Sequence, residues 1–93
     1  MQGRNYIGGR WVDARGGGMF ESRNPANTEE VLGSFPMSHR DEAERAVASA
    51  KAAFPAWRTL SRIARGELLD RFIEVIKVET DEMARLVAKE AGK

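Results

Sequence analysis

Glycine-rich turns, paired carboxylates and a single histidine are the residues of this chain whose types could do chemistry. Gly8-Gly9 and Gly16-Gly17-Gly18 could cradle a phosphate, but a dinucleotide fingerprint needs G-x-G-x-x-G between a strand and a helix. Glu21 stands where the third glycine would be required, and an extended segment follows instead of a helix. The spacing therefore argues against a phosphate loop at either position.

The titratable side chains are explained by local structure. His39 is the only histidine and stands among polar residues, with no nucleophile near it that a general base could activate. The carboxylate pairs Asp41-Glu42 and Asp81-Glu82 fall at predicted helix starts, where the helix dipole favours negative charge. The closing Gly92-Lys93 lacks the upstream glycine of a Walker motif, because position 87 is Val. The residues by themselves predict no catalytic constellation.

Composition excludes several classes of protein. With 15 basic and 14 acidic residues interleaved, no basic face is predicted, which argues against nucleic acid as a partner. The chain has no cysteine, so it holds no disulfide, thiolate metal site or cysteine nucleophile. No apolar run has the length of a signal peptide or of the roughly 20 residues that span a membrane. We expect a cytoplasmic protein without membrane contact.

The elements that must position these residues change in type after the first third of the chain. Residues 1–36 are predicted to form strands and turns, with strands at 5–7, 10–12, 19–22 and 31–35. Gly8-Gly9 suits a two-residue type I′ turn. Asn24-Pro25-Ala26-Asn27 has the chemistry of a second turn, in which Asn27 can bond its own backbone. These turns need no ligand to explain them.

Residues 38–92 are predicted to form three amphipathic helices. Ser38 and Asp41 resemble a capping box for the first helix, and Pro55 is expected to stop that helix near Phe54. The second helix is predicted from about Ser61 to Val78. Thr80 is the expected N-cap of the third, and Gly92 suits the position just after its end. The predicted fold class is an α+β segment with N-terminal β-hairpins followed by three amphipathic helices.

The order of these pieces resembles the N-terminal portion of the NAD(P)⁺-dependent aldehyde dehydrogenase superfamily. The most specific match is Asn24-Pro25-Ala26 followed by Val31-Leu32-Gly33. The run AKAAFPAW at 50–57 and the closing E-x-G-K at 90–93 follow in the expected order. The resemblance covers about residues 5–93. It implies that residues 1–93 are the opening, incomplete portion of a Rossmann-like coenzyme-binding domain.

The resemblance implies an enzyme that oxidises an aldehyde to a carboxylic acid. In the family a cysteine thiolate attacks the aldehyde, hydride passes from the thiohemiacetal to NAD or NADP, and water hydrolyses the thioester. The catalytic and coenzyme-binding residues of the family lie further along the chain, so none is placed on this sequence. The 93-residue piece alone is expected to be inactive and to hold no coenzyme.

One family site is expected to touch this segment. Many aldehyde dehydrogenases hold a structural Na⁺ or K⁺ with oxygens from residues just before the Asn-Pro pair, and here Ser22 and Arg23 align with those positions. Backbone carbonyls suit such a hard cation. The expected partner of the segment is the remainder of an aldehyde dehydrogenase chain, in a homo-oligomer when full length. Two alternatives stay open, a free-standing interaction or oligomerisation module and a relic without function.

Overall fold

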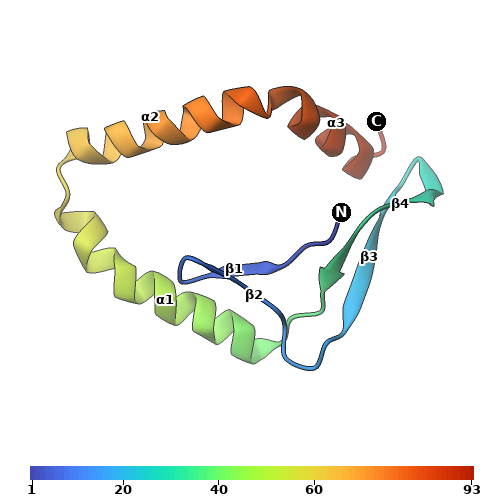
Figure 1. The fold of residues 1–93 in the computed structure, drawn as a ribbon, viewed down its shortest axis with the longest axis horizontal. Coiled ribbons are helices and arrows are strands. Elements are labelled where there is room, and N and C mark those ends of the chain that lie inside the picture. Colours follow the sequence, from blue (N-terminus) through green and yellow to red (C-terminus); the bar gives the residue numbers. More distant parts are fainter.

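The computed structural model describes residues 1–93 and contains two hairpins followed by three helices (Figure 1). The strands are β1 (Asn5–Ile7), β2 (Arg10–Val12), β3 (Met19–Asn24) and β4 (Asn27–Pro36), and the helices are α1 (Arg40–Thr59), α2 (Arg62–Val78) and α3 (Thr80–Glu90). β1 pairs with β2 and β3 with β4, both antiparallel, in two separate sheets. The predicted fold class is confirmed.

The turn between β1 and β2 has the predicted form. Ile7 pairs with Arg10 across a loop of only two residues, Gly8 and Gly9. Their φ angles are 62° and 77°, and a type I′ turn needs positive φ at both of its central residues. Glycine reaches this conformation without the steric cost that a side chain would bring.

The β3–β4 hairpin is longer than the sequence predicts, because its turn is shorter. Asn24 pairs with Asn27, which leaves Pro25 and Ala26 as the whole turn. β3 therefore continues to Asn24 and β4 begins at Asn27, several residues beyond the predicted strand ends. The side chain that fixes the turn is Asn24, whose Oδ1 accepts the Ala26 N–H at 2.9 Å. The prediction gave this kind of role to Asn27.

Helix α1 begins one residue later than the predicted capping box. His39 is the N-cap, and Glu42, at the third helical position, accepts the His39 N–H at 2.8 Å. The prediction of Ser38 with Asp41 was wrong by one residue. The Ser38 hydroxyl is engaged elsewhere, since it accepts a hydrogen bond of 2.8 Å from the Asn5 amide. A contact 33 residues away in sequence thus decides where the helix starts.

Helix α1 also ends later than predicted, because it runs through Pro55 to Thr59. A proline in a helix interior removes one backbone donor and disfavours the helical conformation of the residue before it. The residues that follow nevertheless stay helical, and the Thr59 hydroxyl donates to the Ala56 carbonyl at 2.9 Å. The expected stop at Phe54 was wrong, and because residues 51–60 are all exposed, no packing within this chain explains the continuation.

Helices α2 and α3 are separated only by Glu79. Ser61 caps α2 as predicted, its hydroxyl accepting the Ala64 N–H at 3.1 Å. Glu79, and not Thr80, is the N-cap of α3, so the prediction for Thr80 was wrong. The Thr80 hydroxyl instead donates to the Ile76 carbonyl at 3.1 Å, four residues back. With no loop between the helices, this bond to the preceding turn replaces a cap.

The end of α3 is tied to the β3–β4 turn. Gly92 has φ 69°, its N–H donates to the Lys89 carbonyl, and the Lys93 N–H donates to the Ala88 carbonyl at 2.9 Å. This pair of bonds is the Schellman motif that the predicted position of Gly92 requires. A Cβ at Gly92 would stand 3.2 Å from Pro25 Cβ and from the Ala26 nitrogen. The turn and the helix end therefore pack together only if residue 92 is glycine.

We expect Gly92→Ala to weaken this end of α3 by about 1–2 kcal/mol, because alanine resists positive φ and its methyl group would crowd Pro25. Gly66→Ala is the matched control. Gly66 lies within α2, and no atom of this chain stands within 4 Å of its added Cβ. That substitution should strengthen α2 by about 1 kcal/mol. Hydrogen exchange over residues 80–93 and 62–78 measures both effects, and equal effects of the same sign would contradict the explanation.

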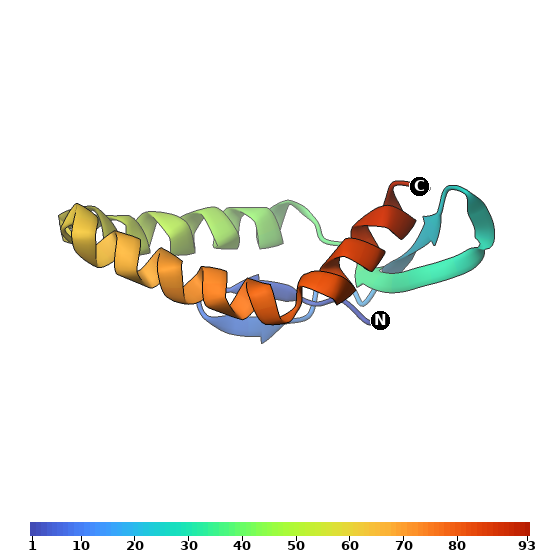
Figure 2. The same cartoon turned by 90° about the horizontal axis from the view of Figure 1, so that it is seen from above.

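The elements form an open, thin frame and not a packed core (Figure 2). The chain measures 48 × 34 × 16 Å, with a radius of gyration of 16.8 Å. A compact domain of this length has a radius of about 12 Å. Only three of 93 residues are buried, namely Ala14, Gly33 and Glu42. No helix is both long enough and apolar enough to cross a membrane.

Candidate functional site

Ser22 and Arg23, the residues predicted to contact a cation, lie at an irregular point of the β3–β4 hairpin. Ser22 is half-buried and pairs with Gly33, and the register shifts on both sides of Arg23. The Arg23 guanidinium turns to the hairpin itself. It donates to the Thr28 carbonyl at 2.8 Å and forms an ion pair of 2.6 Å with Glu21.

This arrangement gives a cation little to bind. The only side-chain oxygen at the two predicted positions is the Ser22 hydroxyl, and no group of three acidic or histidine side chains that could hold a metal exists in the chain. A Na⁺ or K⁺ here would depend on backbone carbonyls and on oxygens from outside these 93 residues. The cation site at Ser22 and Arg23 stays a prediction.

The most deeply buried polar side chain lies at the joint between α1 and the loop after β2. Glu42 is only 2% exposed. Its Oε1 accepts the Arg15 N–H at 2.9 Å, and its Oε2 accepts the His39 N–H at 2.8 Å. These two backbone bonds, the one from Arg15 first, lower the pKa of Glu42 from its ordinary value of 4.5 to about 2, because they stabilise the charged form. Glu42 is thus a structural carboxylate, as the sequence indicated.

Protonation of Glu42 should release both backbone donors. A carboxylate with a lowered pKa stabilises the folded form above its unfolded pKa, and this contribution is lost as the pH falls through the folded value. We therefore expect hydrogen-exchange protection of the Arg15 and His39 amides to fall between about pH 4.5 and about pH 2. In Glu42→Gln it should be about ten-fold lower at neutral pH, since one acceptor is lost.

Glu44→Gln is the control for this prediction. Glu44 is an exposed carboxylate on the same helix, paired with Arg40 at 2.7 Å. Surface pairs of this kind contribute little. Its loss should leave both amides protected as in the parent chain. Equal protection of the Arg15 amide in the two variants at neutral pH would show that Glu42 does not hold the joint.

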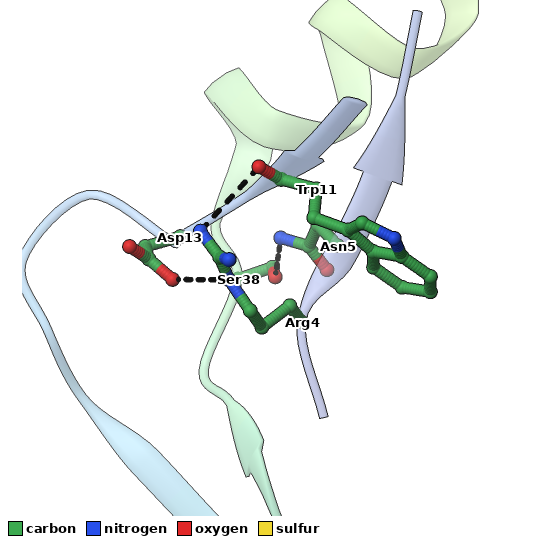
Figure 3. A network of polar contacts seen from close by, with 5 residues as sticks. All are labelled: Arg4, Asn5, Trp11, Asp13 and Ser38. Carbon is green, nitrogen blue, oxygen red and sulfur yellow. Dashed lines mark hydrogen bonds and ion pairs between the residues drawn. The ribbon is translucent and has the colours of Figure 1, made fainter. Parts of the chain in front are cut away.

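A second group of contacts holds the β1–β2 hairpin beside the same joint (Figure 3). Arg4 pairs with Asp13 at 2.9 Å and donates to the Trp11 carbonyl at 3.4 Å. Asn5 donates to Ser38 in the link between β4 and α1. Arg4 precedes β1, Asn5 and Trp11 lie on β1 and β2, and Asp13 and Ser38 lie in the two links. The contacts join these parts of the chain to one another, so they explain architecture.

The other end of the frame is closed by a charged contact. Glu30 on β4 pairs with Lys89 on α3 and accepts a hydrogen bond of 2.9 Å from Asn24. These two bonds, the one from Lys89 first, lower the pKa of Glu30. The pair joins residues 59 positions apart in sequence. Together with the contact of Gly92 on Pro25, it fixes the third helix to the second hairpin.

Catalytic groups are not brought together anywhere in the frame. His39 is exposed at the start of α1, and its backbone N–H donates to the Glu42 carboxylate. Gly16 and Gly17 have positive φ angles of 89° and 66°, and their loop leads into β3 instead of a helix. No helix N-terminus therefore follows the glycines to receive a phosphate.

The dominant feature of the surface is apolar. Twenty large hydrophobic side chains are exposed, and they include most of those on the three helices. The accessible surface is 7606 Å². A compact monomer of this mass exposes roughly 5,400 Å². The chain thus exposes more surface than a compact monomer, and its exposed side chains include many apolar ones. Large exposed apolar patches mark interaction surfaces.

The family profile described as "Aldehyde dehydrogenase family" matches residues 11–93. The chain belongs to this family. The match covers most of the second strand, the β3–β4 hairpin and all three helices, so it spans far more than a single motif. The predicted resemblance to the N-terminal segment of an aldehyde dehydrogenase is confirmed.

Relatives within the aldehyde dehydrogenase family are much longer than this chain. It is 42% identical over 90 residues to malonate-semialdehyde dehydrogenase 2 of Geobacillus kaustophilus, covering 97% of this chain and 18% of that protein. It is 39% identical over 88 residues to the human mitochondrial methylmalonate-semialdehyde/malonate-semialdehyde dehydrogenase (acylating). That match covers 95% of this chain and 16% of the human protein. The chain thus spans about a sixth to a fifth of the length of these relatives.

A solved aldehyde dehydrogenase structure has the same fold over this length. The structure of 3,6-anhydro-L-galactose dehydrogenase in complex with NAP superposes with a TM-score of 0.86 and 32% identity. The superposition covers 97% of this chain and 19% of that one. The matching segment of that longer protein therefore has the same open shape as this chain.

Proposed function

We propose that this chain acts as the N-terminal segment of a full-length NAD(P)⁺-dependent aldehyde dehydrogenase that oxidises an aldehyde to a carboxylic acid. Within that enzyme it would form one wall of the coenzyme-binding domain. The observation that carries the proposal is the uncovered apolar surface of a chain in which three of 93 residues are buried. A protein core needs many more buried side chains than that.

The size of the uncovered surface supports a partner that covers the segment as a core does. The excess over a compact monomer is roughly 2,200 Å², whereas one side of a standard protein interface buries about 800 Å². Relatives of about five times this length supply such a partner within one chain, since this segment is 18% of the relative it matches.

The chemistry of the proposed enzyme falls to residues outside this segment. The segment has no cysteine to act as nucleophile, and its titratable side chains hold the frame together. NAD or NADP would accept the hydride when bound, and we assign no coenzyme contact to these 93 residues. A homo-oligomer in the cytoplasm and a monovalent cation beside Ser22 and Arg23 belong to the same proposal.

Malonate semialdehyde is the first substrate to test. The names of the similar proteins include malonate-semialdehyde and glutarate-semialdehyde dehydrogenases. Both substrates carry a carboxylate besides the aldehyde. A full-length enzyme that contains this segment would, on this proposal, prefer an aldehyde bearing a second acidic group. Rates with malonate semialdehyde and with an uncharged aldehyde of equal length compare the two directly.

The intact mass of the native protein from its source tests the proposal. A mass several times 10.3 kDa is expected, together with a cysteine in the continuation. A native mass of 10.3 kDa would overturn the proposal. The same uncovered surface would then favour a free-standing interaction or oligomerisation module, and light scattering would look for a defined oligomer.

A further inference from the structure

Helix α2 carries seven of the twenty exposed large hydrophobic side chains, more than any other element. Five bulky residues, Leu68, Leu69, Phe72, Ile73 and Ile76, recur at helical spacing. We name them the α2 stripe. Four of them are at least 41% exposed, Phe72 at 60%, and only Ile76 is half-buried. From this geometry, and resting on the proposed function, we infer that the α2 stripe docks against the remainder of the same chain, while the opposite face of α2 stays in solvent.

The two faces of α2 differ in chemistry from Glu67 onward, whereas Arg62 and Arg65 in its first turn lie on the side of the α2 stripe. At about 100° per residue the α2 stripe covers roughly 140° of the helix circumference. Charged residues gather on the other side, and Lys77 and Glu74 form an ion pair of 2.7 Å there. The five charged residues of that face are Glu67, Asp70, Arg71, Glu74 and Lys77. An amphipathic helix of this kind buries its apolar side and leaves its charged side exposed to solvent.

Three exposed apolar residues of α2 lie outside the α2 stripe: Val75, 62% exposed, borders it, and Ile63 and Val78 lie on the charged side. Ile63 is 68% exposed and Val78 is 84% exposed. Each lies roughly 150° around the axis from the centre of the α2 stripe. Single exposed apolar side chains are normal on a protein surface. We therefore expect residues of similar hydrophobicity to differ in burial, according to the side of the helix on which they lie.

Helix α1 adds a second, different face to the same surface. Its apolar side is built mostly from Ala43, Ala46 and Ala50, with Val47 and Phe54. Small side chains let the backbone of a partner approach closely. The bulky α2 stripe fills a wider space. The remainder of the chain would thus stand nearer to α1 than to α2.

The area of the uncovered surface indicates which partner covers it. The uncovered surface is several-fold larger than one side of a standard interface. Relatives of which this segment forms 18% carry enough chain to cover it within one molecule. A second copy of the chain would leave each frame as thin as before, since each copy is only 16 Å deep. We therefore assign the surface to the same polypeptide.

Maleimide labelling of the full-length protein tests the assignment, with single cysteines introduced as Phe72→Cys and Ile63→Cys. The segment has no cysteine of its own, so peptide mapping reads each introduced site separately. We expect labelling at position 72 to be about 100-fold slower than at position 63, because only the α2 stripe is covered. Phe72→Asp should also lower the soluble yield of folded protein far more than Ile63→Asp.

Each other outcome overturns the inference. Equal labelling at both positions in a longer native chain would refute the α2 stripe as a docking surface and leave the proposed function standing. Protection of position 72 that disappears on dilution would assign the surface to a second copy. A native mass of 10.3 kDa would remove the proposed function itself, which the labelling ratio does not measure.

Discussion

The isolated 93-residue chain is expected to unfold on heating without a cooperative transition and to bind the dye ANS strongly. Cooperative unfolding requires a core whose parts lose their contacts together. This chain buries three residues, and one of them is the carboxylate Glu42. Its hairpins meet its helices at two joints, while the faces of α1 and α2 contact water. Exposed apolar surface of this kind binds ANS.

Circular dichroism at 222 nm against temperature, with ANS fluorescence on the same sample, measures both properties. We expect a broad loss of helical signal, because isolated helices of this length are marginal in water. The full-length protein is the control and should show a steep transition with little ANS binding. A sigmoidal transition of a monomeric 93-residue chain, without ANS binding, would mean that the frame is stable on its own.

The sequence was sufficient where local chemistry decides the structure. Gly8-Gly9 defines its turn by backbone preference alone. The Asn24 side chain and the fixed φ of Pro25 define the second turn, and Ser61 and Gly92 mark ends of helices. The change from strands to helices near residue 38 follows from the change of hydrophobic period. These features depend on residues within a few positions of each other, so one sequence is enough to predict them.

Some of the errors lie where a distant part of the chain intervenes, and others have a local cause. Ser38 bonds to Asn5 and so leaves the N-cap to His39. Thr80 has no loop before it and bonds back to Ile76. The sequence identified Glu42 as a carboxylate at a helix start, but its bond to the Arg15 N–H depends on a loop 27 residues away. A Glu three residues after His39 was the one local signal for the correct cap.

The sequence likewise predicted only part of the candidate site. The order of motifs was enough to predict the family, because a series of weak matches over 93 residues is rare by chance. The cation prediction at Ser22 and Arg23 could not be developed from sequence, because its oxygens are backbone groups whose directions depend on the fold. The extent of the uncovered surface needed the structure, since an apolar stripe looks alike in a covered and in an uncovered helix.

The second prediction with a large effect concerns activity. The isolated chain, given NAD⁺ or NADP⁺ and malonate semialdehyde, is expected to produce no NADH or NADPH above the rate without protein. Oxidation by the proposed route needs a nucleophile that adds to the aldehyde carbon before hydride can leave. The chain has no cysteine, and the Glu42 carboxylate accepts two backbone N–H groups and is buried.

Absorbance at 340 nm measures the reaction, and the full-length protein is the positive control at equal molar concentration. The loss should be complete, not partial, since removing the nucleophile of an enzyme costs many orders of magnitude in rate. A full-length variant with Glu44→Gln should keep the parent rate, because Glu44 is an exposed surface carboxylate. Aldehyde-dependent reduction of the coenzyme by the purified 93-residue chain would place catalytic groups within the frame. It would also refute the assignment of the chemistry to the rest of the enzyme.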